Sequence, residues 1–341
     1  VYAVFLLICA AGAVVASLAD NGLTFAAGRA LIALGTTASA VTSYKVYAMW
    51  YPASRLPLAN GLSLSAGSIG MMLGTLPVQA ALAFMDWRAI HLIVAAMLVL
   101  AAVGVLALVP ARQPEKAGEA LWQQFKGLGE IIGSSKFWHA APLLAVVAGM
   151  YGGLIQLWSG PWIRDVAGLS GGATANVLFL AAGAMVLSGI ATGPLSGLTR
   201  RLGLPIMGFA VLASSAFTII VFLMAMPWVA GPLAAYLLWG VFGIVAPLTM
   251  VMYAALGPEF PKELNGRLNA CLTLSWLLGA FLVQNIYGFV LDRFPNTETG
   301  YAPEGHRLAM GINFGILVVT LAWYFVFGAI IRRWAKIKSR P

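Results

Sequence analysis

The chain has 341 residues, of which 61% are hydrophobic and only 9% are charged, and its mean hydropathy is +0.89. A soluble domain usually has about 25% charged residues, so this composition excludes an ordinary water-soluble globular protein and indicates that lipid is the solvent. The formal net charge of +9 would suggest nucleic acid as a partner of a soluble protein, but here loop charges that set membrane topology explain it, and we expect no nucleic acid partner.

The chain begins Val1-Tyr2-Ala3-Val4-Phe5, without an initiator methionine or a basic n-region, so it does not resemble a signal peptide and is expected to be entered partway through a longer protein. Ten apolar blocks follow, each long enough to cross a core of about 30 Å as a helix. We predict spans near 1–19, 25–50, 58–84, 89–110, 139–160, 172–198, 205–226, 230–256, 266–291 and 308–331.

A charged stretch, residues 111–137, separates four of these blocks from the other six. We therefore predict a partial N-terminal bundle at 1–110, a cytoplasmic linker at 111–137, and a six-helix bundle with a basic tail at 138–341. Apolar residues recur at helical spacing in the linker, which predicts either an amphipathic helix on the inner leaflet or a loose loop. These residues are Leu121, Trp122, Phe125, Leu128, Ile131 and Ile132.

Lys and Arg are distributed unevenly between the two sides of the predicted membrane. When loops are assigned to alternate sides, one side receives fourteen of the twenty basic residues and the other side receives four. Because cytoplasmic loops carry the excess of Lys and Arg, the linker and the C-terminus are predicted to be cytoplasmic. Small residues repeat every four positions at Gly189, Gly193 and Gly197 and at Gly70 and Gly74, which predicts close helix packing. Pro77, Pro194 and Pro247 are expected to bend their helices.

Arg29 and Lys45 are the two charged residues inside a predicted span, and a charge in lipid requires a reason. Both are candidate substrate-binding residues. Lys45 could instead extend its ammonium toward the cytoplasm, and Arg29 could pair with a carbonyl or a neighbouring helix. They lie about 160° apart around one helix, so at most one of them is expected to face a cavity. Cations without a nearby carboxylate would favour an anionic solute.

Uncharged polar residues supply further candidates in the C-terminal half. We expect Tyr151, Gln156, Trp239, Thr273, Gln284 and Asn285 to contact a small solute, although interhelical hydrogen bonds and aromatic packing would explain each of them as well. All eleven carboxylates fall in or at the edge of loops, His91, His139 and His306 lack metal-ligand spacing, and no GxxxxGK[ST] loop is present. We therefore expect no metal, no cofactor and no enzymatic activity. Cys9 and Cys271 are interpreted as core residues rather than a disulfide.

Four short motifs occur in order along the chain. They are Gly28-Arg29-Ala30-Leu31 followed by Gly35, Asp86-Trp87-Arg88, Leu198-Thr199-Arg200-Arg201-Leu202-Gly203, and Phe260-Pro261-Lys262-Glu263-Leu264-Asn265-Gly266-Arg267. Taken together, these motifs resemble the major facilitator superfamily (MFS) of transporters over the whole chain. They match its fourth-helix arginine motif, its turn between helices five and six, and its loops between helices eight and nine and between ten and eleven. Arg200 stands where that family's loop has an aspartate, which puts the usual charge latch in doubt.

The resemblance implies an all-α membrane protein with an MFS-type bundle of ten helices, in which the first span is the family's third and the first two helices are missing. A native ten-helix protein is the alternative. It further implies a monomeric permease in the cytoplasmic (inner) membrane that moves a small-molecule solute by alternating access, with the proton as a candidate coupling ion and Arg29 as the favoured cavity residue. The run from Gly67 to Pro77 lacks the glycine–proline step of many drug antiporters. A proton-driven multidrug or solute efflux antiporter, and a transporter-like scaffold or sensor, remain alternatives.

Overall fold

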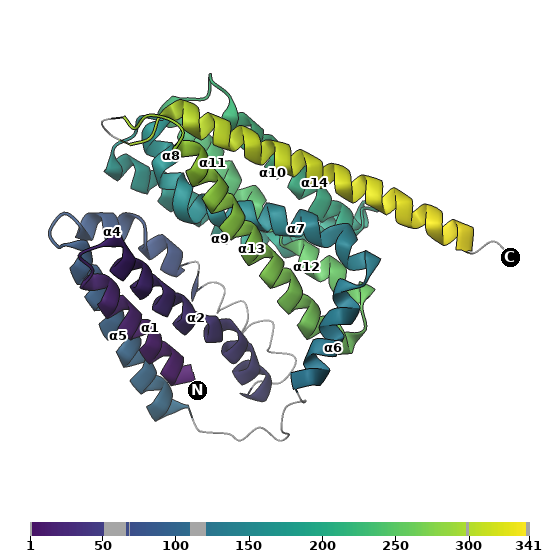
Figure 1. The fold of residues 1–341 in the computed structure, drawn as a ribbon, viewed down its shortest axis with the longest axis horizontal. Coiled ribbons are helices and arrows are strands. Elements are labelled where there is room, and N and C mark those ends of the chain that lie inside the picture. The colour runs from purple at the N-terminus through teal and green to yellow at the C-terminus, as the bar shows by residue number, and fades with distance from the viewer. Residues whose placement is uncertain (1, 51–65, 68, 110–120, 298–299, 339–341) are drawn as a thin grey trace. The chain divides into compact units, whose positions relative to one another are not determined.

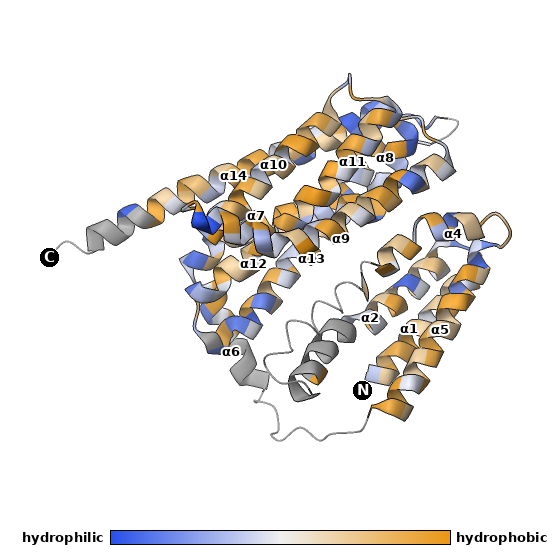
Figure 2. Cartoon of the chain, turned by 180° about the vertical axis from the view of Figure 1, so that it is seen from behind, coloured by the Kyte–Doolittle hydropathy of each residue, from blue (hydrophilic) through white to orange (hydrophobic). Residues whose placement is uncertain are grey.

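The computed structural model describes residues 2–50, 66–67, 69–109, 121–297 and 300–338. Every regular element among these residues is a helix, and the chain divides into two compact units, Val1–Ala117 and Gly118–Pro341 (Figure 1). Apolar residues cover most of the helical surface (Figure 2). The predicted all-α membrane fold is thus confirmed for the described part of the chain.

The first unit is held together by a close crossing of its first two helices. Its helices are α1 (Tyr2–Ser17), α2 (Gly22–Trp50), α4 (Leu76–Ala81) and α5 (Trp87–Leu108), and α1 packs against both α2 and α5. A Cβ built on Gly28 would lie 2.6 Å from the Ala16 nitrogen, and one built on Gly35 would lie 2.6 Å from the Cys9 nitrogen. The two backbones can therefore touch, and their association is stabilised by dispersion.

The second unit surrounds a large apolar core. Its helices are α6 (Leu121–Ile132), α7 (Ser135–Gly153), the π-helix η2 (Leu154–Trp158), α8 (Ser159–Asp165), α9 (Gly171–Arg201), α10 (Ile206–Ala225), α11 (Gly231–Leu248), α12 (Val251–Leu256), the short 3₁₀ turns η3 (Gly257–Glu259) and η4 (Lys262–Leu264), α13 (Asn265–Leu291) and α14 (Pro303–Lys338). The main packing pairs are α7 with α13, α9 with α11, and α10 with α14. Trp162, Phe217 and Phe242 are among the largest side chains that are fully buried between them.

Seven helices of the described residues are long and apolar enough to cross a membrane, so the predicted count of ten is not supported by them. Tyr2–Ser17 and Ile69–Ala81 are apolar but shorter. The helix α2 has 29 residues, but Arg29, Lys45 and several Ser and Thr residues lower its hydropathy. In the predicted span at 58–84, residues 58–65 and 68 lie outside the described residues.

The three prolines expected to bend their helices have different effects. The helix α11 ends one residue after Pro247, and α4 begins at Leu76 just before Pro77, so a helix is interrupted at both sites where a bend was expected. The helix α9 continues through Pro194 to Arg201.

The repeated glycines of α9, at 189, 193 and 197, have no neighbour within 4 Å of a built Cβ. They do not mediate a close contact within their own unit, so the predicted close packing at these glycines is not found there.

The linker contains a helix that packs on the second unit. Residues 111–120 lie outside the described part, but α6 follows them, and the prediction of a helix in the linker is confirmed. Ile131 is fully buried in the apolar core, and a Cβ built on Gly127 would lie 2.6 Å from the Arg267 guanidinium. The end of α6 is therefore part of the second unit.

Candidate functional site

A π-helix interrupts the long helix that opens the second unit. The helical run from Ser135 to Asp165 passes through η2, in which each turn holds an extra residue. Such segments are rare and occur frequently at functional sites. In η2, Gln156 is exposed whereas Trp158 is only 8% exposed, so the segment presents an amide on the surface of the bundle and an indole to its interior.

Two glutamines lie beside adjacent glycines at the end of α7: Gln156 of η2 beside Gly152, and Gln284 of α13 beside Gly153. Gly152 and Gly153 leave room for them, because a Cβ built on Gly152 would lie 3.5 Å from Nε2 of Gln156 and one built on Gly153 would lie 3.3 Å from Cγ of Gln284. Gln284 is half-buried. Each amide can donate and accept hydrogen bonds, so the Gln156–Gln284 pair offers a neutral polar patch on an otherwise apolar bundle.

Trp158 fixes α13 relative to the π-helix. Its Nε1 donates a hydrogen bond of 3.2 Å to the backbone oxygen of Gln284, and its ring stacks on Tyr287 with centroids 4.8 Å apart and planes at 21°. The absence of a side chain at Gly288 permits this stacking, since a Cβ there would lie 3.2 Å from the indole ring. The position of Gln284 therefore depends on Trp158.

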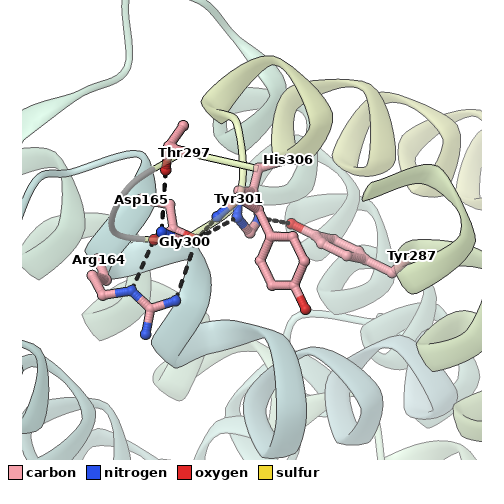
Figure 3. A network of polar contacts seen from close by, with 7 residues as sticks. All are labelled: Arg164, Asp165, Tyr287, Thr297, Gly300, Tyr301 and His306. Atoms are coloured by element: carbon pink, nitrogen blue, oxygen red, sulfur yellow. Dashed lines mark hydrogen bonds and ion pairs between the residues drawn. The ribbon is translucent and has the colours of Figure 1, made fainter. Parts of the chain in front are cut away.

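A buried polar cluster lies next to this stack and joins α8, α13 and α14 (Figure 3). We name it the Asp165 cluster; it consists of Arg164, Asp165, Tyr287, Tyr301 and His306. The side chains of Asp165 and His306 are 1% and 0% exposed, and Oδ2 of Asp165 lies 3.1 Å from Nε2 of His306. The hydroxyl of Tyr287, which is also fully buried, lies 3.0 Å from Nδ1 of His306.

The carboxylate of Asp165 accepts further hydrogen bonds from the surrounding chain. Arg164 donates from Nε to Oδ1 at 2.8 Å, and the backbone nitrogen of Tyr301 donates to Oδ2 at 3.0 Å. Because a carboxylate can only accept, Nε2 of His306 is assigned as a donor to Asp165, and Nδ1 is then the acceptor for the Tyr287 hydroxyl when the imidazole is neutral. Gly300 contacts Oδ1 of Asp165 so closely that a side chain there would displace the carboxylate.

This cluster corrects one expectation from the sequence. Asp165 ends a helix, as a loop-edge carboxylate should, but it is buried and paired with a histidine. The order carboxylate, imidazole, hydroxyl is also found in hydrolase triads. Here Asp165, Tyr287 and His306 are all buried, so a substrate cannot reach the hydroxyl. Among the described residues, no group of three His, Cys, Asp or Glu could hold a metal ion.

The other predicted site residues are placed on several helices. Arg29 is exposed on α2, and Lys45 belongs to α2 but its side chain lies outside the described part. Tyr151 is half-buried on α7, with its ring 6.2 Å from that of Phe242. Trp239 is fully buried against Trp162, so its indole does not reach the surface of the second unit.

Two predicted residues of α13 are exposed but partly occupied by neighbours. Thr273 lies 3.5 Å from the hydroxyl of Tyr253, and Asn285 donates from Nδ2 to the backbone oxygen of Phe281 in its own helix at 2.7 Å. Gln156 and Gln284 thus both lie beside the Gly152–Gly153 step of α7, whereas the other candidates have neighbours elsewhere. Sequence reasoning missed Asp165, Tyr287 and His306 because nothing in the local sequence connects residues so far apart.

The role of Trp158 can be tested with Trp158→Phe. We expect the apparent free energy of unfolding to fall by about 1 kcal/mol, because an aromatic ring remains on Tyr287 while the indole donor to Gln284 is lost. Thermal unfolding of the purified protein in detergent measures the change. Trp228→Phe is the control, since Trp228 is 74% exposed and should give no shift. Equal behaviour of the two variants would show that the indole hydrogen bond contributes nothing.

Comparison with known proteins assigns the family. The model of the Major Facilitator Superfamily matches residues 1–284. The chain belongs to the major facilitator superfamily. No curated protein matches the chain at the threshold applied. Solved MFS structures are similar in fold, among them a bacterial homolog of the human lysosomal transporter Spinster in an inward-facing, unoccupied conformation (18% identity, TM-score 0.67) and the nucleoside transporter NupG (14% identity, TM-score 0.65). Each alignment covers 96% of this chain and 82% of the other.

The MFS motifs of this chain have structural roles within their units. Gly28 and Gly35 lie at the crossing of α1 and α2, beside the exposed Arg29. Arg88 donates a hydrogen bond of 2.9 Å to the backbone oxygen of Ala19, which ties the start of α5 to the end of α1. Arg200 is exposed at the end of α9. The fold is that of the MFS transporters.

Proposed function

We propose that this MFS protein is a secondary transporter that moves a small organic solute across the cytoplasmic membrane by alternating access. In this proposal the ten predicted spans form a four-helix and a six-helix part, and the linker and α14 end in the cytoplasm. Family membership supports transport of a small molecule, and the Gln156–Gln284 pair at the π-helix is the observation on which the choice of site rests. Gln156 is exposed and Gln284 is half-buried on an otherwise apolar helical surface, and amides so placed can form hydrogen bonds to a solute.

The class of solute follows from the charges and amides available. Arg29 is exposed within a helix of the first unit, and the buried Asp165 is already bonded by His306 and Arg164. An exposed cation without an exposed partner acid on its helix favours an anionic group on the solute, and the glutamine amides favour hydrogen-bonding groups on the rest of it. We therefore propose a small organic anion, with the proton as coupling ion.

Uptake into liposomes that contain the full chain tests this proposal. Labelled benzoate, tetraethylammonium and uridine serve as anionic, cationic and neutral probes, with and without an imposed pH gradient. We expect uptake of the anion, increased by the gradient. Preference for the cation would overturn the substrate class, and uptake without response to the gradient would overturn proton coupling. Failure of all three probes, extended to a broader panel of organic anions, would favour the transporter-like scaffold or sensor.

Variants of the amide pair locate the site. Gln156→Leu and Gln284→Leu are each expected to raise KM for the transported probe by about three- to tenfold, because each removes one hydrogen bond to the solute. Asn176→Leu is the matched control, since Asn176 is an exposed amide on α9 and the substitution changes polarity in the same way. If all three variants transport equally well, the amide pair is not the binding site.

A further inference from the structure

A groove lies between α10 and α14, near the end of the second unit from which α14 extends to Lys338. Its volume is about 540 Å³, within the range of small-molecule sites. His139 and Tyr324 contribute to its wall as a stacked pair, with ring centroids 4.3 Å apart and planes at 10°. The lining is otherwise almost entirely apolar and consists of Leu204, Pro205, Met207, Gly208, Val211, Leu212, Ser215 and Phe325.

The side chains around the groove are of the kinds found on membrane proteins where lipid acyl chains meet the headgroups. Leu212 and Phe325 are 59% and 57% exposed, and such apolar surface on membrane helices is covered by lipid. Trp138 and Trp323 are 45% and 42% exposed beside His139 and Tyr324, and Nε1 of Trp323 donates to the backbone oxygen of Trp138 at 2.8 Å. Exposed tryptophans of this kind are typical of the membrane–water interface.

Basic residues lie at the end of α9, just before α10, and on α14. Arg200 and Arg201 end α9, only three residues before Leu204 in the groove wall, and both are exposed. On the other side, α14 carries the exposed Arg333 and further basic residues beyond Phe325. The sequence has no Asp or Glu from residue 166 to 258 or from 305 to 341, so neither element neutralises these charges itself.

None of the ion pairs among the described residues includes Arg200, Arg201 or Arg333. Glu259 is paired with Lys136 at 3.2 Å, which leaves Glu130 of α6 and Glu263 of η4 as the other described acids on the α6–α7 and α12–α13 connections. An apolar groove flanked by uncompensated cations at a membrane interface has the two properties that an anionic phospholipid recognises.

We propose that the groove between α10 and α14 binds one acyl chain of an anionic phospholipid, with its phosphate headgroup held by Arg200, Arg201 and Arg333. The aromatic pair His139–Tyr324 supports the groove wall at the level where the chain meets the headgroup. The site is independent of the Gln156–Gln284 pair, and its test does not require a transported solute. A bound lipid would tie α9 to α14, whose ends lie at this side of the unit.

Lipid retention by the full chain tests the proposal. Purified protein is exchanged into micelles with dioleoyl phosphatidylglycerol or dioleoyl phosphatidylcholine, and bound lipid is counted by native mass spectrometry. We expect one phosphatidylglycerol to be retained in preference to phosphatidylcholine. Arg201→Gln should weaken its retention about five-fold, since each basic group near a membrane surface contributes about that factor. Arg293→Gln is the matched control, because Arg293 lies over Phe289 beyond the far end of α13 and should have no effect.

A second variant tests the groove itself. Ser215→Trp places an indole in the groove and should abolish retention of phosphatidylglycerol while the protein elutes as a folded species. If that variant fails to fold, Arg201→Gln against Arg293→Gln still decides the matter. Equal retention of the two lipids would overturn the proposal, and so would an equal loss of phosphatidylglycerol from both arginine variants. Complete displacement of bound phosphatidylglycerol by inorganic phosphate alone would also overturn it.

Discussion

Gly279→Ala is expected to lower the apparent free energy of unfolding by about 3 kcal/mol, at the upper end of overpacking costs. The helices α7 and α13 cross at this residue. A Cβ on Gly279 would overlap the backbone oxygen of Ala145, and one on Gly149 would lie 2.5 Å from the carbonyl carbon of Gly279. Both obstacles are backbone atoms, so the added methyl group can be accommodated only if the two helices separate.

The matched control is the same substitution at a glycine with open surroundings. Gly189→Ala in α9 meets nothing within 4 Å and should stabilise the protein by up to about 1 kcal/mol, because alanine favours a helix over glycine. A thiol-reactive dye measures unfolding of both variants, since Cys9 and Cys271 are free and buried in the folded protein. If Gly279→Ala unfolds no earlier than Gly189→Ala, the close crossing of α7 and α13 is wrong.

Asp165→Ala should have an equal or larger effect, about 3–5 kcal/mol, because it leaves the buried His306 without its carboxylate partner. The backbone nitrogen of Tyr301 and the Arg164 guanidinium lose an acceptor as well. Tyr287→Phe removes a single hydrogen bond, that to His306, and should cost about 1–2 kcal/mol. The same thermal unfolding assay gives both values.

Asp292→Ala is the control for this series. Asp292 is exposed at the C-terminal end of α13, where an acid opposes the helix dipole, so its removal should leave stability unchanged or slightly improved. A result in which Asp165→Ala and Asp292→Ala unfold at the same temperature would show that the Asp165 cluster does not stabilise the second unit.

Composition and hydropathy were sufficient to predict a helical membrane protein, because runs of about twenty apolar residues have no other stable structure in lipid. Proline was expected to bend three helices; helices are interrupted near Pro247 and Pro77, whereas α9 continues through Pro194. The glycines that bring helices together were not identified from spacing alone. Gly149 and Gly279 contact each other, and Gly149 stands four residues before Gly153, but the equally spaced glycines of α9 contact no neighbouring helix of the second unit.

The candidate site was partly predictable. Gln156 and Gln284 could be singled out as polar residues in apolar helices, but their proximity depends on the π-helix and on Gly152 and Gly153, which periodicity does not reveal. The burial of Asp165 was missed because a carboxylate next to a loop is normally hydrated. Only the fold brings His306 and the Tyr301 amide to it, and sequence without covariation carries no information on such distant pairs.

The separation of these partners has a consequence for biogenesis. Asp165 precedes Tyr301 by 136 residues and His306 by 141. At about 5–20 residues translated per second, the carboxylate leaves the ribosome on the order of ten seconds before the imidazole exists. During this interval Asp165 has the adjacent Arg164 but neither His306 nor the Tyr301 amide, so insertion of α14 by the translocon is the event that completes the cluster. Quality-control proteases would therefore encounter an unfinished polar interior in any chain that stops before α14.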